Sequence, residues 1–230
     1  MEERHVLQNC IAAHCFEQPE AEQVQRLRKS LGLADDTFVV LYVGRILEYK
    51  GVRELIRAVD ALPNDNIALV LVGSTNFGLQ TVDEYEQQVK LMADNSKKTM
   101  LFTGFVANEE LGPFYAMADT VVMPSLCQEA AGLVSIEAMA AGRPEVATVS
   151  GGLPEYLTAD CGILVPQDDE LIPNLTEAIG RLYGDAELRR TMGEAGLARA
   201  RQFSPEGYFE RFWQIVKNLG SEPDAEETEA

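Results

Sequence analysis

The chain has 230 residues, 46% of them hydrophobic, and a formal net charge of −18. This length and composition allow one full α/β core with a short appendage, so we expect a single domain. The strong negative charge argues against nucleic acid or an anionic membrane surface as a partner, because both would repel it.

The sequence shows neither a membrane span nor a secretory signal. No apolar run approaches the roughly 20 residues that cross a bilayer, and the N-terminus lacks the basic and apolar regions of a signal peptide. The 4 cysteines are too sparse for a disulfide framework in a chain of this length. We therefore expect a cytoplasmic protein.

Short apolar runs alternate with segments of helical period from Phe38 onward. Helices are predicted within 52–62 and within 82–94, in a stretch that ends near Ala118, and at 133–141. This alternation is typical of a parallel sheet covered on both faces, so the fold class is α/β, a Rossmann-like doubly wound sheet of about six strands. The predicted strands are 38–43, 67–72, 100–103, 120–123, 145–149 and 162–165.

The two ends of the chain differ from this core. We treat 1–37 as an N-terminal linker and expect the acidic tail at 220–230 to be disordered. A closing helix is predicted at 204–219, with Ser204 as its N-cap and Pro205 at its first position. Its apolar residues form two adjoining stripes, more than one domain's flank requires, so the helix is also a candidate contact for a homo-oligomer.

The most informative segment surrounds Gly132. Gly132 allows a tight turn after a short strand, and 133–141 then favours a helix. Glu129 precedes this helix and Glu137 lies on its second turn, so both are placed to face a ligand at the helix N-terminus. The free amides of the first turn suit an anion such as a diphosphate, and the carboxylates suit sugar and ribose hydroxyls.

A second candidate site follows the first predicted strand. Arg45 and Lys50 lie between Gly44 and Gly51 and precede a helix, a position from which two cations can hold a diphosphate. Two solvated surface cations would be the ordinary interpretation of such residues. The flanking glycines and the nearby pair of glutamates favour phosphate contact instead.

These residues carry a family resemblance. The Glu-x7-Glu element of Glu129 and Glu137 resembles the signature of the group-1 (family 4) retaining glycosyltransferases, which have the two-domain GT-B fold and use nucleotide-diphosphate sugars. The likeness runs from about residue 39 to residue 219 and covers only the donor-binding half, so the resemblance makes 38–203 a nucleotide-sugar-binding domain. Four further segments match in the family's order, namely 43–51, 151–155, 161–166 and 203–206.

The resemblance implies a role for each candidate residue. Arg45 and Lys50 would contact the donor diphosphate and neutralise it as it leaves, and Glu129 would accept a hydrogen bond from a donor-sugar hydroxyl. Glu137 would bind the ribose hydroxyls. These roles make Arg45, Lys50 and Glu129 the catalytic set, with no metal and no cofactor beyond the donor. The donor-binding set is Gly44, Arg45, Lys50, Glu129, Gly132, Leu133, Val134 and Glu137.

The resemblance also implies a missing partner. The catalytic histidine and the acceptor loops of the family belong to an N-terminal domain, and neither His5 nor His14 matches them. We expect this chain to bind donor but to transfer little sugar without an N-terminal acceptor domain, supplied in the same protein or by a partner chain. Any attachment to the inner face of a membrane would come through that domain.

Several positions depart from the family pattern. Ala131 and Cys127 stand where larger aromatic residues are common, which leaves the donor's identity open. Glu145 follows Pro144 where an apolar residue usually begins a strand. A carboxylate there is tolerable only if it reaches solvent or a cation.

The same sequence admits other interpretations. A non-catalytic nucleotide-sugar binding module, or one subunit of a split transferase, fits the same motifs. A dinucleotide-dependent oxidoreductase is disfavoured because 44–51 lacks the Gly-x-Gly-x-x-Gly turn. A zinc site is disfavoured because adjacent His14 and Cys15 would chelate awkwardly; its ligands would be His5, Cys10, His14 and Cys15. The base, the sugar and the acceptor do not follow from the sequence.

Overall fold

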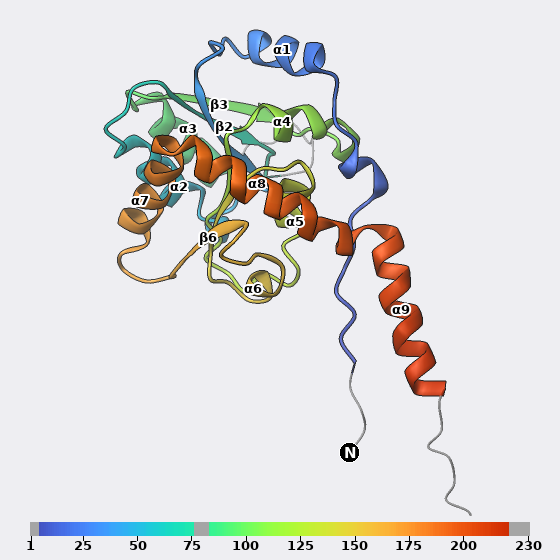
Figure 1. The fold of residues 1–230 in the computed structure, drawn as a ribbon. Helices are drawn as coiled ribbons and strands as arrows, with labels where there is room; N and C mark the ends of the chain where they lie inside the picture. The colour runs from blue at the N-terminus through green and yellow to red at the C-terminus, as the bar shows by residue number, and fades with distance from the viewer. Residues whose placement is uncertain (1–4, 76–82, 221–230) are drawn as a thin grey trace, which may run out of the picture.

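The computed structural model describes residues 5–75 and 83–220, and its core is one sheet with helices on both faces (Figure 1). Within these residues the sheet has six parallel strands in the order β3-β2-β1-β4-β5-β6. The order reverses between β1 and β4, which is where ligands of open α/β sheets bind. The strands are β1 (Phe38–Val43), β2 (Ile67–Val72), β3 (Thr99–Gly104), β4 (Thr120–Met123), β5 (Glu145–Thr148) and β6 (Gly162–Val165).

The central strands are apolar throughout because both of their faces are covered. Val40 and Tyr42 of β1 face one layer of helices, and Val39 and Leu41 face the other. The first layer contains α2 (Val52–Asp60), α3 (Glu84–Asp94) and α7 (Leu171–Gly184). The second contains α1 (Ala21–Ser30), α4 (Gly112–Met117) and α5 (Leu133–Ala140), with α8 (Ala186–Ala200) packed on α5.

The predicted α/β class and parallel sheet are confirmed, and each predicted strand is present to within one residue at either end. Three of the longer helices were not anticipated. Helices α7 and α8 lie between β6 and the closing helix, and α1 lies inside the segment treated as a linker. Helix α1 is polar overall and carries few apolar residues, but Val24 and Leu27 lie three positions apart on one face and pack against the second layer. Arg28 donates to the carbonyl of Met117 at 3.0 Å.

The expectation for Glu145 was wrong. Its side chain is fully buried at the start of β5 and reaches neither solvent nor a cation. The hydroxyl of Ser135 donates to Oε2 of Glu145, and Oε1 has no partner among the described residues. Burial raises the pKa of this carboxyl to about 7, so the strand tolerates Glu145 by keeping it protonated up to neutral pH.

The closing helix is α9 (Pro205–Gly220), and it extends away from the sheet beside the N-terminal segment (Figure 1). The predicted cap is present, because the amide of Gly207 donates to Oγ of Ser204 at 3.1 Å. Its apolar face is exposed, with Phe209 62% and Trp213 47% exposed. Residues 221–230 of the predicted tail lie outside the described residues.

The remaining elements are short. Helix α6 (Leu153–Tyr156) follows β5, and single turns occur at η1 (Ala13–Phe16), η2 (Glu48–Lys50), η3 (Asn108–Glu110) and η4 (Arg201–Phe203). Among the helices in the described part of the chain, none has the length and apolar character required to span a membrane.

Candidate functional site

Two loops meet where the strand order reverses, one after β1 and one after β4. They are joined by a backbone hydrogen bond of 2.8 Å from the amide of Leu126 to the carbonyl of Tyr49. Gly51 has φ 70°, and a Cβ there would lie 1.9 Å from the carbonyl oxygen of Pro124. Only glycine permits this approach, so Gly51 sets how closely the two loops pack.

The approach brings Lys50 and Glu129 together. Nζ of Lys50 lies 2.6 Å from Oε1 of Glu129, and the two side chains are 21% and 12% exposed. The hydroxyl of Ser125 donates to the same carboxylate oxygen. A charged group held by two donors in a partly buried position has a fixed orientation, so Glu129 is presented to the loop junction in one geometry.

Arg45 is placed by two tyrosines. The hydroxyl of the buried Tyr42 donates to the carbonyl of Arg45 at 2.7 Å, which fixes the backbone after β1. The guanidinium of Arg45 donates to the hydroxyl of Tyr49 at 2.7 Å. The centroid of the Tyr49 ring lies 5.8 Å from the ammonium of Lys50 and 5.9 Å from the guanidinium of Arg45, so one ring contacts both cations.

The Gly-Gly turn at 151–152 supports the Glu129 loop. A Cβ on Gly151, where φ is 49°, would lie 2.2 Å from the carbonyl oxygen of Glu129. The amide of Gly152 donates to that carbonyl at 2.8 Å, and the amide of Glu129 donates to the hydroxyl of Ser150 at 3.2 Å. The two glycines are therefore required by the close backbone approach that positions Glu129.

Helix α5 begins at this junction. Gly132 caps it in the left-handed region, with φ 55°. Within the described residues, neither the amide of Leu133 nor that of Val134 donates a hydrogen bond. Both line a cavity of about 210 Å³, and seven of the predicted residues line it together: Gly44, Arg45, Lys50, Glu129, Gly132, Leu133 and Val134.

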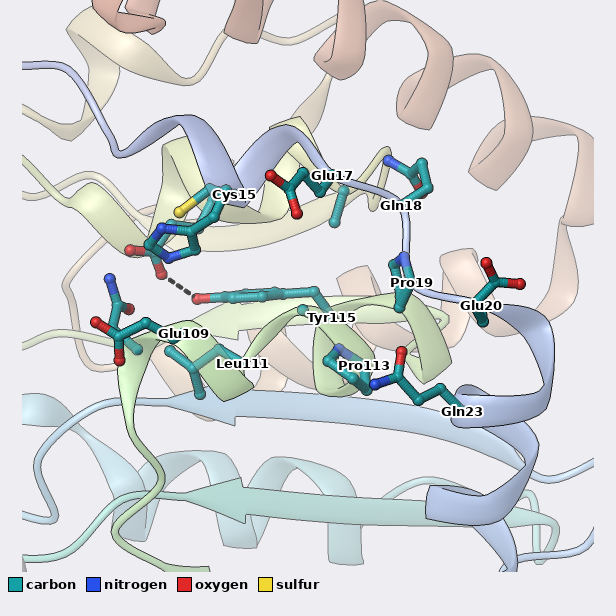
Figure 2. A pocket seen from close by; sticks show the side chains of 15 residues that line it. Cys15, Glu17, Gln18, Pro19, Glu20, Gln23, Glu109, Leu111, Pro113 and Tyr115 are labelled. Atoms are coloured by element: carbon teal, nitrogen blue, oxygen red, sulfur yellow. Dashed lines mark hydrogen bonds between the residues drawn. The ribbon is translucent and has the colours of Figure 1, made fainter.

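Glu137 lies one turn further along α5 and lines a different cavity, of about 270 Å³. The hydroxyl of Tyr115 donates to its Oε2 at 2.6 Å, and Figure 2 draws this bond as the dashed line from Tyr115. Burial raises the pKa of Glu137, whereas the Tyr115 hydrogen bond and the nearby His14 oppose that rise. The hydrogen-bond partner of this buried carboxylate is thus a tyrosine.

The sequence pointed to most of this site but not to the residues that support it. Tyr115, Ser125 and Ser150 were missed, because hydroxyl residues in apolar or loop segments have no distinctive spacing.

Burial raises the pKa of Cys15 to about 11. Among the described residues, which include the His5, Cys10, His14 and Cys15 set, no group of three potential ligands is placed to hold a metal ion.

Comparison with known proteins identifies the family. Residues 23–199 match the family described as "Glycosyl transferases group 1". The chain belongs to this family. The glycosyltransferase match begins inside α1, so this helix of the predicted linker is partly within the family domain.

Two curated relatives illustrate the likeness. This glycosyltransferase chain is 35% identical over 185 residues to a D-inositol 3-phosphate glycosyltransferase from Corynebacterium glutamicum, an alignment covering 78% of this chain and 43% of the relative. It is 30% identical over 210 residues to a lipopolysaccharide 1,2-N-acetylglucosaminetransferase from Salmonella typhimurium, covering 89% and 54%. The chain thus spans about half the length of these relatives.

Solved structures give the same picture. HepE from Anabaena, in complex with UDP-glucose, superposes with a TM-score of 0.77 at 26% identity and covers 90% of this chain and 55% of HepE. The C-terminal domain of the group 1 protein LpcC from Francisella tularensis superposes with a TM-score of 0.66 at 26% identity, covering 84% and 97%. This glycosyltransferase chain is therefore the Rossmann-like, donor-binding half of the GT-B fold.

Proposed function

We propose that this domain binds a uridine-diphosphate sugar at the junction of the β1 and β4 loops. The observation that carries the proposal is the set of groups in the smaller cavity. Lys50 and Arg45 lie there with the first two amides of α5, which donate no hydrogen bond within the described residues. Two cations and a helix N-terminus are a strong combination for a diphosphate. The UDP-glucose complex of HepE supports uridine as the base.

In this proposal the cavity beside Lys50 holds the diphosphate, and the cavity beside Glu137 holds the ribose. Val134 and Glu137 are three residues apart on α5, about 4.5 Å along the helix axis and on the same face. A diphosphate on the amides of Leu133 and Val134 would extend its nucleoside along this face. The ribose hydroxyls would then reach the carboxylate of Glu137, while Glu129 would accept from a hydroxyl of the sugar.

In the proposed reaction the sugar passes to the acceptor with retention. The bond from the anomeric carbon to the diphosphate oxygen breaks, and a bond to the acceptor oxygen forms on the same face. The acceptor proton goes to the departing phosphate oxygen. Arg45, Lys50 and the α5 amides stabilise the charge that develops on the diphosphate.

Sugar transfer to an acceptor is proposed to need a second domain. This chain spans about half of its relatives, and the apolar face of α9 is exposed. We propose that an N-terminal acceptor domain packs on this face, either in a longer protein or in a partner chain, and that the assembly acts in the cytoplasm. A non-catalytic donor-binding module is the alternative.

A calorimetric screen tests the donor site. The 230-residue chain is titrated with UDP, GDP and ADP, and with UDP-glucose. Binding of UDP in preference to the other two nucleotides supports the proposal. No binding to any nucleoside diphosphate by the folded chain would exclude a donor site at this junction.

A further inference from the structure

Tyr115 and Glu137 form a buried pair between two helices. They lie 22 residues apart, on α4 and α5, and Tyr115 is 3% exposed. Only Oε2 of the carboxylate is held by the hydroxyl, at 2.6 Å. In the described part of the chain no group donates to Oε1, so one oxygen is fixed and the other is left to accept.

The surroundings of Tyr115 keep its hydroxyl protonated. Burial and the charge of Glu137 raise the pKa of Tyr115 well above its ordinary value, so its hydroxyl stays a donor. Figure 2 shows the ring of Tyr115 between the segment that carries Cys15 and Glu17 and the residues Leu111 and Pro113. The ring is confined, which fixes the direction in which the hydroxyl donates.

A glutamate side chain has three rotatable bonds, and freezing them is costly unless something holds the carboxylate in place. At Glu137 a single donor with a confined ring supplies this constraint. The constraint acts before any ligand arrives, so a hydroxyl that binds Oε1 meets an oriented acceptor and loses less entropy on binding.

We propose that Tyr115 is a positioning residue that orients Glu137 to accept hydrogen bonds from the ribose hydroxyls of the donor. The inference rests on the proposed function, because it assigns Glu137 to the ribose. Tyr115 itself touches no ligand in this arrangement. Its contribution is specific to ligands that carry ribose hydroxyls.

The test compares two probes, UDP and 2′,3′-dideoxyuridine diphosphate, by calorimetric titration. The wild-type chain should bind UDP about tenfold more tightly than the dideoxy compound, on the scale of a hydrogen bond to a charged group. Tyr115→Phe keeps the ring and removes the hydroxyl. It should reduce this preference to about twofold while the affinity for the dideoxy probe stays unchanged.

Tyr85→Phe is the matched control. Its hydroxyl accepts from the amide of Arg53 at 3.3 Å, and the residue lines neither cavity, so its loss should leave the preference unchanged. Tyr115→Phe leaves the buried carboxylate of Glu137 without a donor, which could destabilise the fold. The comparison of the two probes is therefore repeated in a Glu137→Gln background, where residue 137 carries no charge. Removing the Tyr115 hydroxyl there should again lower the preference for UDP.

The outcomes separate two failures. Absence of UDP binding by the wild-type chain contradicts the proposed function itself. Wild-type binding of UDP with a full preference retained in Tyr115→Phe contradicts the positioning role alone. An equal loss of affinity for both probes also overturns it, because a purely structural hydroxyl would affect both alike.

Discussion

Lys50 and Glu129 are 79 residues apart in sequence, and their side chains meet at 2.6 Å across the junction of the β1 and β4 loops. The pair joins the proposed phosphate contact to the proposed sugar contact. A diphosphate that binds Lys50 must compete with Glu129 for the ammonium group. The two residues should therefore have opposite effects on nucleotide affinity.

The first prediction concerns the cations. Lys50→Ala and Arg45→Ala should each weaken UDP binding by about 1.5–3 kcal/mol, the range of a lost charged hydrogen bond, without unfolding the chain. Titration calorimetry measures the affinity and circular dichroism the fold. Lys90→Ala is the control, because Lys90 forms a 2.8 Å ion pair with Glu86 on α3, away from the cavity. Unchanged UDP affinity in both folded variants would remove the phosphate assignment.

The second prediction concerns the partner carboxylate. Glu129→Gln keeps the shape of the side chain but releases Lys50 from its ion pair, so UDP should bind as tightly as in the wild type or up to about tenfold more tightly. UDP-glucose should lose any advantage over UDP, because the sugar hydroxyl loses its charged acceptor. A Glu129→Gln chain that binds UDP more weakly and keeps its preference for UDP-glucose would reverse the assignment.

The third prediction uses the buried carboxyl of Glu145. Its pKa of about 7 in the folded chain is above its ordinary value of 4.5, so its stabilising contribution is complete below 4.5 and is lost as the pH rises through 7. Glu145→Gln cannot ionise. The free energy of unfolding of Glu145→Gln, relative to that of the wild type, should rise between about pH 5 and about pH 8 by about 3 kcal/mol. Urea titrations of both chains across this range measure the difference, and a constant difference would mean that Glu145 does not titrate there.

The fourth prediction concerns the exposed face of α9. Phe209 and Trp213 stack with ring centroids 6.4 Å apart and are both exposed, so the isolated chain should self-associate as its concentration rises. Changing both to Glu should leave a monomer. Sedimentation and light scattering measure the state, with Leu91→Glu as a control at an exposed apolar residue on α3. A wild-type chain that stays monomeric at every concentration would exclude this contact between copies.

The fifth prediction distinguishes a donor-binding half from a complete enzyme. The purified chain should bind UDP-glucose but transfer negligible sugar to added acceptors, because none of its residues matches the catalytic groups of the family's N-terminal domain. Product formation is followed with a radiolabelled donor. Robust transfer by the chain alone would show that no second half is needed.

The sequence by itself determined the elements and the outline of the site. Apolar runs located the strands, because a strand covered on both faces must be apolar along its whole length. The Ser204 cap of α9 was predictable from its neighbouring residues, because helix capping is a local interaction. The Glu-x7-Glu spacing placed Glu129 before α5 and Glu137 on it, where the structure has them.

The tertiary structure alone decided which side chains meet. Tyr115 reaches Glu137 because α4 and α5 cover the same face of the sheet, and no local pattern encodes that packing. Glu145 was expected to need solvent or a cation, but burial beside Ser135 raised its pKa and removed the need. Helix α1 is stabilised mainly by the packing of Val24 and Leu27 on the second layer, because a helix of this length is marginal without tertiary contacts. Periodicity and caps act over a few residues, whereas burial and pairing depend on elements far apart in the chain.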